Sequence, residues 1–114
     1  MNIYVICPVR NQSDEQKLEL ENYKFKKEAE GDKVFLPHLD APQKDISGVE
    51  IVRKEIEAIN WADEVHLFWD SNSKGSHFDL GVAFALKKKI VIIKEYQERP
   101  AHSYMSVVAL WEIK

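Results

Sequence analysis

The sequence is poor in cysteine and lacks any long apolar run. Cys7 is the single cysteine among 114 residues, so no disulfide can form within the chain, and a reducing compartment such as the cytoplasm is expected. No stretch approaches the roughly 18 apolar residues of a membrane span. The apolar run from Ile3 to Cys7 is also too short for a signal peptide. These absences predict a cytoplasmic protein with no membrane partner.

The chain also lacks a large excess of either positive or negative charge. The 16 basic and 19 acidic residues leave a formal net charge of -3, and both signs are spread along the chain. Proteins that grip a nucleic-acid backbone usually carry a marked basic excess, so we expect no nucleic-acid partner, while a mononucleotide remains a possible ligand. The four histidines and one cysteine show no zinc-ligand spacing, and no metal is expected.

Apolar and aromatic side chains are plentiful. They make up 45% of the chain, which is enough to build a packed interior. A chain of 114 residues is close to the common size of one domain and leaves little material for a second core. We therefore predict a single domain that covers residues 1–114.

Short apolar runs alternate with longer segments of helical character. The run from Asn2 to Cys7 is typical of a strand buried on both faces. Ser13 and Gln16 form a capping box ahead of a helix predicted from about Asp14 to Glu30. From Gly48 to Trp61, apolar residues recur at steps of three and four, which indicates a helix with one buried stripe. Further strands are predicted at 33–36, 64–69, 90–93 and 107–113, and a third helix at about 76–88.

This alternation predicts a mainly parallel sheet with helices on both faces. We expect an α/β three-layer sandwich of flavodoxin-like, or Rossmann-like, type with five strands in the order 2-1-3-4-5. In such sheets ligands bind beyond the carboxyl ends of the strands, where the strand order reverses. The loops that begin at Cys7 and Asp70 are therefore expected to meet over one pocket.

Three acidic residues, Asp70, Asp79 and Glu55, are expected to project toward that pocket. Two carboxylates about 5 Å apart can cleave a glycosidic bond, one attacking the anomeric carbon while another group assists the leaving base. Spacing alone favours simpler roles. Asp79 fits a capping box that begins at Ser76, and Glu55 fits a boundary residue of its helix with the carboxylate in solvent.

The segment from Ser73 to Leu86 places Asp79 in a pattern that suggests a catalytic role. It reads Ser-Lys-Gly-Ser-His-Phe-Asp-Leu-Gly-Val-Ala-Phe-Ala-Leu and is followed by Lys89 and an apolar strand. This segment resembles the nucleoside 2-deoxyribosyltransferase superfamily, whose pattern is a small polar loop, an aromatic residue, an acid, Leu-Gly and an alanine-rich helix. The similarity is closest to the branch that hydrolyses 2'-deoxynucleoside 5'-monophosphates, and it covers most of the chain.

The resemblance implies cleavage of the N-glycosidic bond of a (deoxy)nucleoside or its 5'-monophosphate, by hydrolysis or base transfer. The family nucleophile, normally Glu, corresponds to Asp79, and a second family acid, normally Asp, corresponds to Glu55, eight residues before Asp63. The two acids have exchanged lengths. Either the exchange preserves the distance between the two groups, or the chain is a non-catalytic member that binds or senses nucleotides in the same pocket.

The resemblance also implies roles around the substrate. Tyr4 would orient the nucleophile, with core packing as the alternative, and Arg10 would end a turn in which Cys7 and Pro8 replace the family's Gly-Ser. For Arg10 the alternative is a solvated loop cation. No cofactor is implied. The predicted substrate-binding residues are Arg10, Asp70, Ser73, Gly75 and Ser103.

Two of these residues concern a phosphate. Ser73 and Ser103 fall where the monophosphate branch holds the 5'-phosphate, the second from a neighbouring subunit, and a helix N-terminus after Ser73 favours an anion. A homo-oligomer, a dimer or larger, is therefore implied. Two further residues carry simpler expectations. Trp69 either stacks on the nucleobase or packs in the core, and Cys7 is expected to be a buried structural thiol.

Overall fold

The computed structural model describes residues 1–41, 44 and 47–111. The elements follow in the order β1 (Asn2–Ile6), α1 (Asp14–Ala29), β2 (Lys33–Phe35), α2 (Pro37–Asp40), α3 (Val49–Trp61), β3 (Glu64–Trp69), α4 (Lys74–Ala85), β4 (Lys89–Glu95) and α5 (Tyr104–Trp111). Within the described residues, four strands form one parallel sheet in the order β2-β1-β3-β4. The α/β class, the parallel sheet and the order of these four strands are confirmed.

The predicted fifth strand is wrong. Of the region predicted at 107–113, residues 107–111 belong to α5, and residues 112–114 lie outside the described part of the chain. Ser103 begins the helix: its side chain accepts a hydrogen bond from the Ser106 N–H at 3.1 Å, and its carbonyl accepts one from the Val107 N–H at 3.0 Å. A short apolar run fits a buried helix as well as a strand. The serine cap was the signal that distinguished them.

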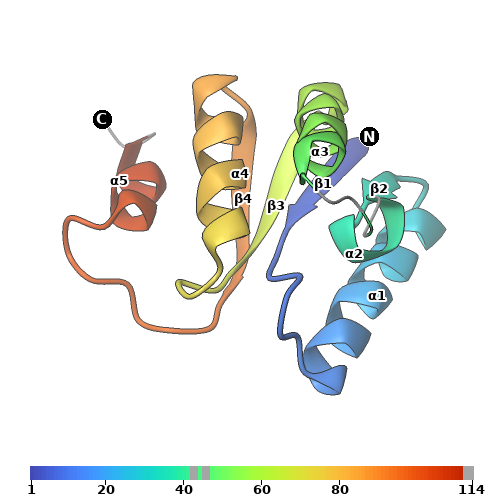
Figure 1. Cartoon of the computed structure of the whole chain (residues 1–114), viewed down its shortest axis with the longest axis horizontal. Helices are drawn as coiled ribbons and strands as arrows, with labels where there is room; N and C mark the ends of the chain where they lie inside the picture. Colours follow the sequence, from blue (N-terminus) through green and yellow to red (C-terminus); the bar gives the residue numbers. More distant parts are fainter. Residues whose placement is uncertain (42–43, 45–46, 112–114) are drawn as a thin grey trace.

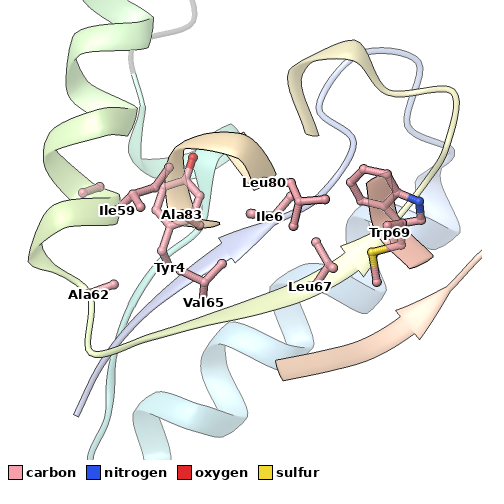
Figure 2. Close-up of a cluster of buried hydrophobic side chains, with 11 residues drawn as sticks. Tyr4, Ile6, Ile59, Ala62, Val65, Leu67, Trp69, Leu80 and Ala83 are labelled. Carbon is pink, nitrogen blue, oxygen red and sulfur yellow. The ribbon is translucent and has the colours of Figure 1, made fainter. Parts of the chain in front are cut away.

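Helices cover both faces of the sheet (Figure 1). The core on the α3 and α4 side contains Tyr4, Ile6, Ala58, Ile59, Ala62, Val65, Leu67, Trp69, Leu80, Ala83 and Met105 (Figure 2). The core on the α1 side contains Ile3, Val5, Cys7, Leu20, Val34, Leu36 and Phe68. Alternate residues of β1 and β3 thus enter opposite cores, as the two-residue period of a strand requires. Tyr4 consequently faces α3 and α4.

The helix ends show one confirmed cap and one correction. The capping box of Ser13 and Gln16 is present at the start of α1. Helix α4 begins earlier than expected, because the side chain of Ser73 caps it by accepting a hydrogen bond from the Ser76 N–H at 3.2 Å. Ser76 is therefore inside the helix, and its buried hydroxyl has no hydrogen-bond partner among the described residues. Asp79 lies in the second turn, so its interpretation as a capping residue is wrong.

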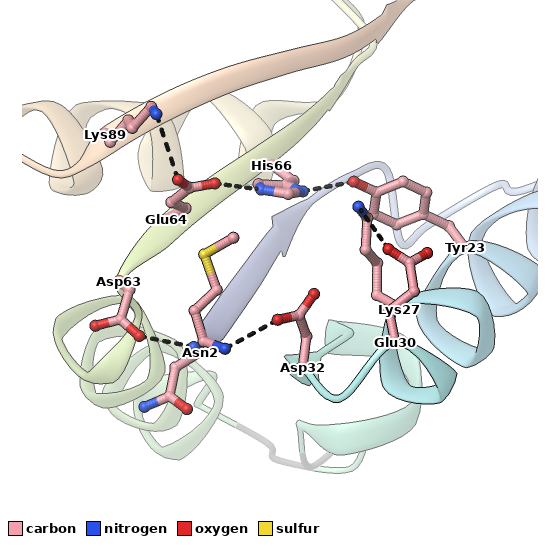
Figure 3. A network of polar contacts seen from close by, with 10 residues as sticks. Asn2, Tyr23, Lys27, Glu30, Asp32, Asp63, Glu64, His66 and Lys89 are labelled. Carbon is pink, nitrogen blue, oxygen red and sulfur yellow. Dashed lines mark hydrogen bonds and ion pairs between the residues drawn. The ribbon is translucent and has the colours of Figure 1, made fainter.

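A polar network ties α1 to the face of the sheet that lies away from α3 and α4 (Figure 3). His66 on β3 is only 4% exposed, and its Nε2 lies 2.9 Å from a carboxylate oxygen of Glu64. Because a carboxylate can only accept, Nε2 carries the proton. The other ring nitrogen lies 2.5 Å from the hydroxyl of Tyr23 on α1, and Lys89 on β4 adds an ion pair to Glu64 at 3.4 Å. The network joins three elements of the fold on the side away from α3 and α4.

In the part of the chain that the structure describes, none of the helices is long and apolar enough to cross a membrane.

Candidate active site

Three of the predicted residues, Tyr4 on β1, Glu55 on α3 and Asp79 on α4, meet on one face of the sheet. The Tyr4 hydroxyl donates a hydrogen bond to Asp79 Oδ2 at 2.9 Å and lies 3.2 Å from Glu55 Oε2. A hydroxyl has one proton, so the shorter contact, to Asp79, is the stronger one. The packing of α3 and α4 against β1 is what brings these distant parts of the sequence together.

The Tyr4 ring is held firmly. It is fully buried and stacks on Phe35 of the neighbouring strand, with ring centroids 5.4 Å apart and an angle of 11° between the planes. Figure 2 shows it between Ile59 of α3 and Ala83 of α4. Burial, together with the nearby carboxylates, raises the pKa of Tyr4 far above its usual range, so the hydroxyl remains a donor. The core packing expected as one alternative is confirmed, and Tyr4 also donates a hydrogen bond to the Asp79 carboxyl. Its role in orienting a nucleophile stays a prediction.

No pattern in the sequence marks Phe35 as a residue of the site. Its role depends on the register of β1 with β2, in which Tyr4 and Phe35 are partners. A sequence contains no direct signal for that register, although a pair of aromatic residues on two expected neighbouring strands would have justified the question.

Asp79 is a buried carboxyl that keeps its proton near neutral pH. Asp79 is 5% exposed, and this burial raises the pKa of its carboxyl group to about 8. The negative charge of Glu55 acts in the same direction, as does a hydrogen bond to Glu55 that favours the protonated form. The hydrogen bond from Tyr4 opposes this rise because it favours the charged form. The rise in the pKa of Asp79 caused by burial and by Glu55 is larger than the fall caused by Tyr4.

Glu55 lies at the edge of the same core. It is half-buried and precedes the fully buried Ile59 by one helical turn, so both side chains lie on the same face of α3. The boundary position expected from its spacing is confirmed. The expectation of a carboxylate free in solvent is wrong, because the carboxylate lies beside the Tyr4 hydroxyl and close enough to Asp79 to affect its titration.

Three of the residues expected to bind the substrate lie around the start of α4 and in the turn after β1. Ser73 is half-buried and caps α4. Gly75 is exposed in the first turn of that helix. Arg10 is exposed in the turn that follows β1. Their roles toward a ligand stay predictions.

Asp70 serves the fold directly. Its Oδ1 accepts hydrogen bonds from the Asn72 N–H at 2.9 Å and from Gln97 Nε2 at 3.0 Å. Gln97 Oε1 in turn accepts from the Ser71 N–H at 2.8 Å. These bonds fasten the loop after β3 to the loop after β4. A part in substrate binding would have to be compatible with this structural role, and it stays a prediction.

Ser103 is half-buried and donates a hydrogen bond from its hydroxyl to Ser106 Oγ at 3.1 Å. It lines a cavity of about 40 Å³ together with residues of the same chain, among them Ser71, His77 and Arg99. Its expected contribution to the site of a neighbouring subunit stays a prediction.

Trp69 and Cys7 are core residues. Trp69 is 3% exposed, and its ring packs 4.7 Å from the ring of His77, which confirms the packing interpretation. Cys7 is buried, and burial raises the pKa of its thiol well above the usual range. The thiol therefore stays protonated, as expected of a structural cysteine.

Neither a protein-family model nor a curated protein sequence matches this chain. Solved structures do match its fold. The CMP N-glycosidase BcmB of Clostridium botulinum shares 19% identity and a TM-score of 0.69, with 97% of this chain and 80% of that chain covered. A 2-deoxyribosyltransferase from Bacillus psychrosaccharolyticus shares 20% identity and a TM-score of 0.71, with 86% and 76% covered. A conserved protein from Enterococcus faecalis V583 shares 21% identity and a TM-score of 0.63, with 97% and 74% covered.

At these identities the comparisons show a shared fold. Two of the three neighbours are by name an N-glycosidase and a deoxyribosyltransferase. The fold therefore agrees with the resemblance to the nucleoside 2-deoxyribosyltransferase superfamily that the sequence indicated.

Proposed function

We propose that this protein cleaves the N-glycosidic bond of a nucleoside or a nucleoside 5'-monophosphate, by hydrolysis or by base transfer. The hydrogen-bonded group of Tyr4, Glu55 and Asp79 carries this proposal. Enzymes that cleave glycosidic bonds usually use a pair of carboxyl groups in different protonation states. The fold that the chain shares with an N-glycosidase and a deoxyribosyltransferase supports the choice of substrate class.

In the proposed reaction one carboxylate attacks C1' of the sugar, and the base leaves with the electron pair of the C1'–N bond. Water or a second base then attacks C1' and releases the carboxylate. The sequence resemblance assigns the attack to Asp79, its orientation to Tyr4 and assistance to Glu55. The other expected contacts to the substrate are Arg10, Asp70, Ser73, Gly75 and Ser103, with the N-terminus of α4 favouring a phosphate.

Release of free base tests the proposal. We expect the purified protein, incubated with a panel of ribo- and deoxyribonucleosides and their 5'-monophosphates, to release one or a few bases at a rate proportional to protein concentration, measured by chromatography. The matched control is the double variant Glu55→Gln, Asp79→Asn, which removes both carboxyl groups and keeps their shapes. Equal release by this control places the activity elsewhere. Binding of nucleotides without release supports the non-catalytic alternative.

We also propose that the protein is a homodimer or a larger homo-oligomer that buries an apolar surface formed by α4 and α5. The side chains exposed on this surface are Phe78, Tyr104, Val107, Leu110 and Trp111. A groove of about 650 Å³ lies between the two helices, and its lining is largely apolar. Monomeric proteins rarely expose contiguous apolar patches of this kind. A second copy seated there would agree with the expected contribution of Ser103 across an interface.

Leu110→Glu is expected to shift the protein toward monomer, because the charge would be buried without a partner in the interface. Leu110 is 53% exposed in the single chain. We expect wild type to run as a dimer or larger at micromolar concentration in sedimentation or light scattering, and the association to weaken by about 30-fold or more in the variant. The control is Phe25→Glu on α1, where Phe25 is 54% exposed, and it should keep the wild-type mass. A wild-type protein that is active as a monomer contradicts the proposal.

A further inference from the structure

We infer that Glu55 is the carboxylate that attacks the sugar and that Asp79 is a positioning residue that holds Glu55 through a hydrogen bond. This inference rests on the proposed function and reverses the two roles that the sequence resemblance assigned. It is supported by the access to each carboxyl group, by the distribution of charge between them and by the place of Tyr4.

Access favours Glu55 over Asp79. The attacking oxygen must come within about 3–3.5 Å of C1'. Asp79 is 5% exposed, and its Oδ2 accepts the hydrogen bond of Tyr4 at 2.9 Å. Glu55 is only half-buried, and its contact with the same hydroxyl is longer, at 3.2 Å. Its side chain also has one methylene more than that of Asp79. Glu55 is therefore the carboxyl that a sugar can reach without displacing Tyr4.

The distribution of charge also favours Glu55. A nucleophilic carboxylate must be ionised, and burial raises the pKa of Asp79 to about 8, so Asp79 is mainly protonated at neutral pH. Two carboxyl groups this close do not readily ionise together. Because Asp79 keeps the proton, the single negative charge of the pair resides on Glu55. Protonated Asp79 then donates a hydrogen bond to Glu55 and fixes its direction.

Among the described residues, the titratable groups that face Asp79 are few. Tyr4 on β1 and Cys7 just after it are neutral, because burial raises the pKa of both. Glu55 is the acid that faces it from α3. With two neutral neighbours and one anionic one, the protonation state of Asp79 is set by its own burial and by Glu55.

The reaction balances with Asp79 neutral throughout. Glu55 Oε forms a bond to C1', and the C1'–N bond breaks with its electron pair going to the base, which takes a proton from water. A second water molecule then attacks C1' and loses a proton. The C1'–O bond to Glu55 breaks, and its electron pair restores the carboxylate. The hydroxide left by the first step neutralises the proton released in the second.

Two variants separate the roles. In Asp79→Asn the amide oxygen can accept from Tyr4 and the amide N–H can donate to Glu55, as the neutral carboxyl does, so we expect turnover to fall no more than about tenfold, the scale of a perturbed hydrogen bond. Glu55→Gln removes the attacking charge, and we expect turnover to fall on the order of 10³-fold or more. Both are measured as base release with the substrate that wild type prefers.

The pH dependence provides a readout that a purely structural Asp79 would not move. If Asp79 acts in its protonated form, the activity of wild type falls as the pH rises through about 8, and this decline is absent in Asp79→Asn. A nucleophilic Asp79 has the opposite sign, since activity would then rise over the same range.

Trapping the covalent intermediate identifies the attacking residue in unmodified protein. A nucleoside with fluorine at C2' slows the breakdown of a glycosyl ester, and mass spectrometry of the digested protein locates the sugar. We expect it on the α3 peptide that contains Glu55. Attachment to the α4 peptide that contains Asp79, or an active Glu55→Gln beside an inactive Asp79→Asn, overturns the inference. Failure of wild type to release any base overturns the proposed function itself and this inference with it.

Discussion

Replacement of Tyr4 by phenylalanine is expected to lower base release roughly 100-fold while the protein stays folded. The hydroxyl donates to Asp79 at 2.9 Å and lies 3.2 Å from Glu55, so its loss removes the donor to Asp79 and the polar group beside Glu55. Loss of one preorganised donor from a buried catalytic site commonly costs about 10²–10³-fold. The ring keeps its stacking on Phe35, which preserves the packing. Steady-state kcat and KM measure the effect.

The same variant should also shift the titration of Asp79. The hydrogen bond from Tyr4 favours the charged form, so its removal raises the pKa of Asp79 above about 8, and the alkaline change in activity moves to higher pH. The control is Tyr23→Phe, which removes a hydroxyl from the opposite face of the sheet, where it contacts His66. This control should keep turnover close to wild type. Full activity of Tyr4→Phe would show that the hydroxyl has no part in the reaction.

Asp79→Asn is expected to stabilise the fold at alkaline pH. The pKa of Asp79 is about 8 in the folded protein and about 3.9 for an exposed aspartate. Between these values the folded state binds more protons than the unfolded state, so the free energy of unfolding of wild type falls as the pH rises from about 4 to 8 and levels off above. Asparagine has no charge to bury and avoids this loss.

The stability gained by Asp79→Asn depends on the difference between the folded and unfolded pKa of Asp79. A separation of about 4 pH units sets an upper limit of about 5 kcal/mol, and we expect a gain of about 3 kcal/mol above pH 8, fading toward pH 4. Denaturant unfolding of both proteins at pH 5, 7 and 9 measures it. The control, Glu57→Gln, removes an exposed carboxylate from α3 and should show no such trend. An Asp79→Asn protein less stable than wild type at pH 9 contradicts the burial argument.

Both predictions concern one residue cluster in which stability and activity are opposed. An isolated buried carboxyl costs folding free energy when it is ionised, and a protein without a use for it gains by replacing it. Asp79→Asn is expected to be more stable than wild type at high pH and to have an altered pH profile of turnover. Together these results would show that Asp79 lowers the folding stability and, in return, tunes the reactivity of Glu55.

Much of the fold follows from local sequence patterns. The capping box of Ser13 and Gln16 marks the start of α1, the apolar stripe marks α3, and the strand predicted at 64–69 coincides with β3. These features depend on residues a few positions apart, so a pattern along the chain is sufficient to detect them. The region 107–113 was assigned wrongly because an apolar run of that length satisfies a helix and a strand equally well, and the cap at Ser103 decided for α5.

The sequence by itself determined which residues to consider for the site, because Tyr4, Glu55 and Asp79 match positions of a family pattern. Only the tertiary structure decided their states. Asp79 holds a proton because α4 buries it against β1 and because α3 brings Glu55 beside it. Asp70, equally acidic in sequence, is instead fixed by Asn72 and Gln97 in a loop. A pKa depends on burial and on distances through space, and these are set by how the helices pack rather than by the order of residues along the chain.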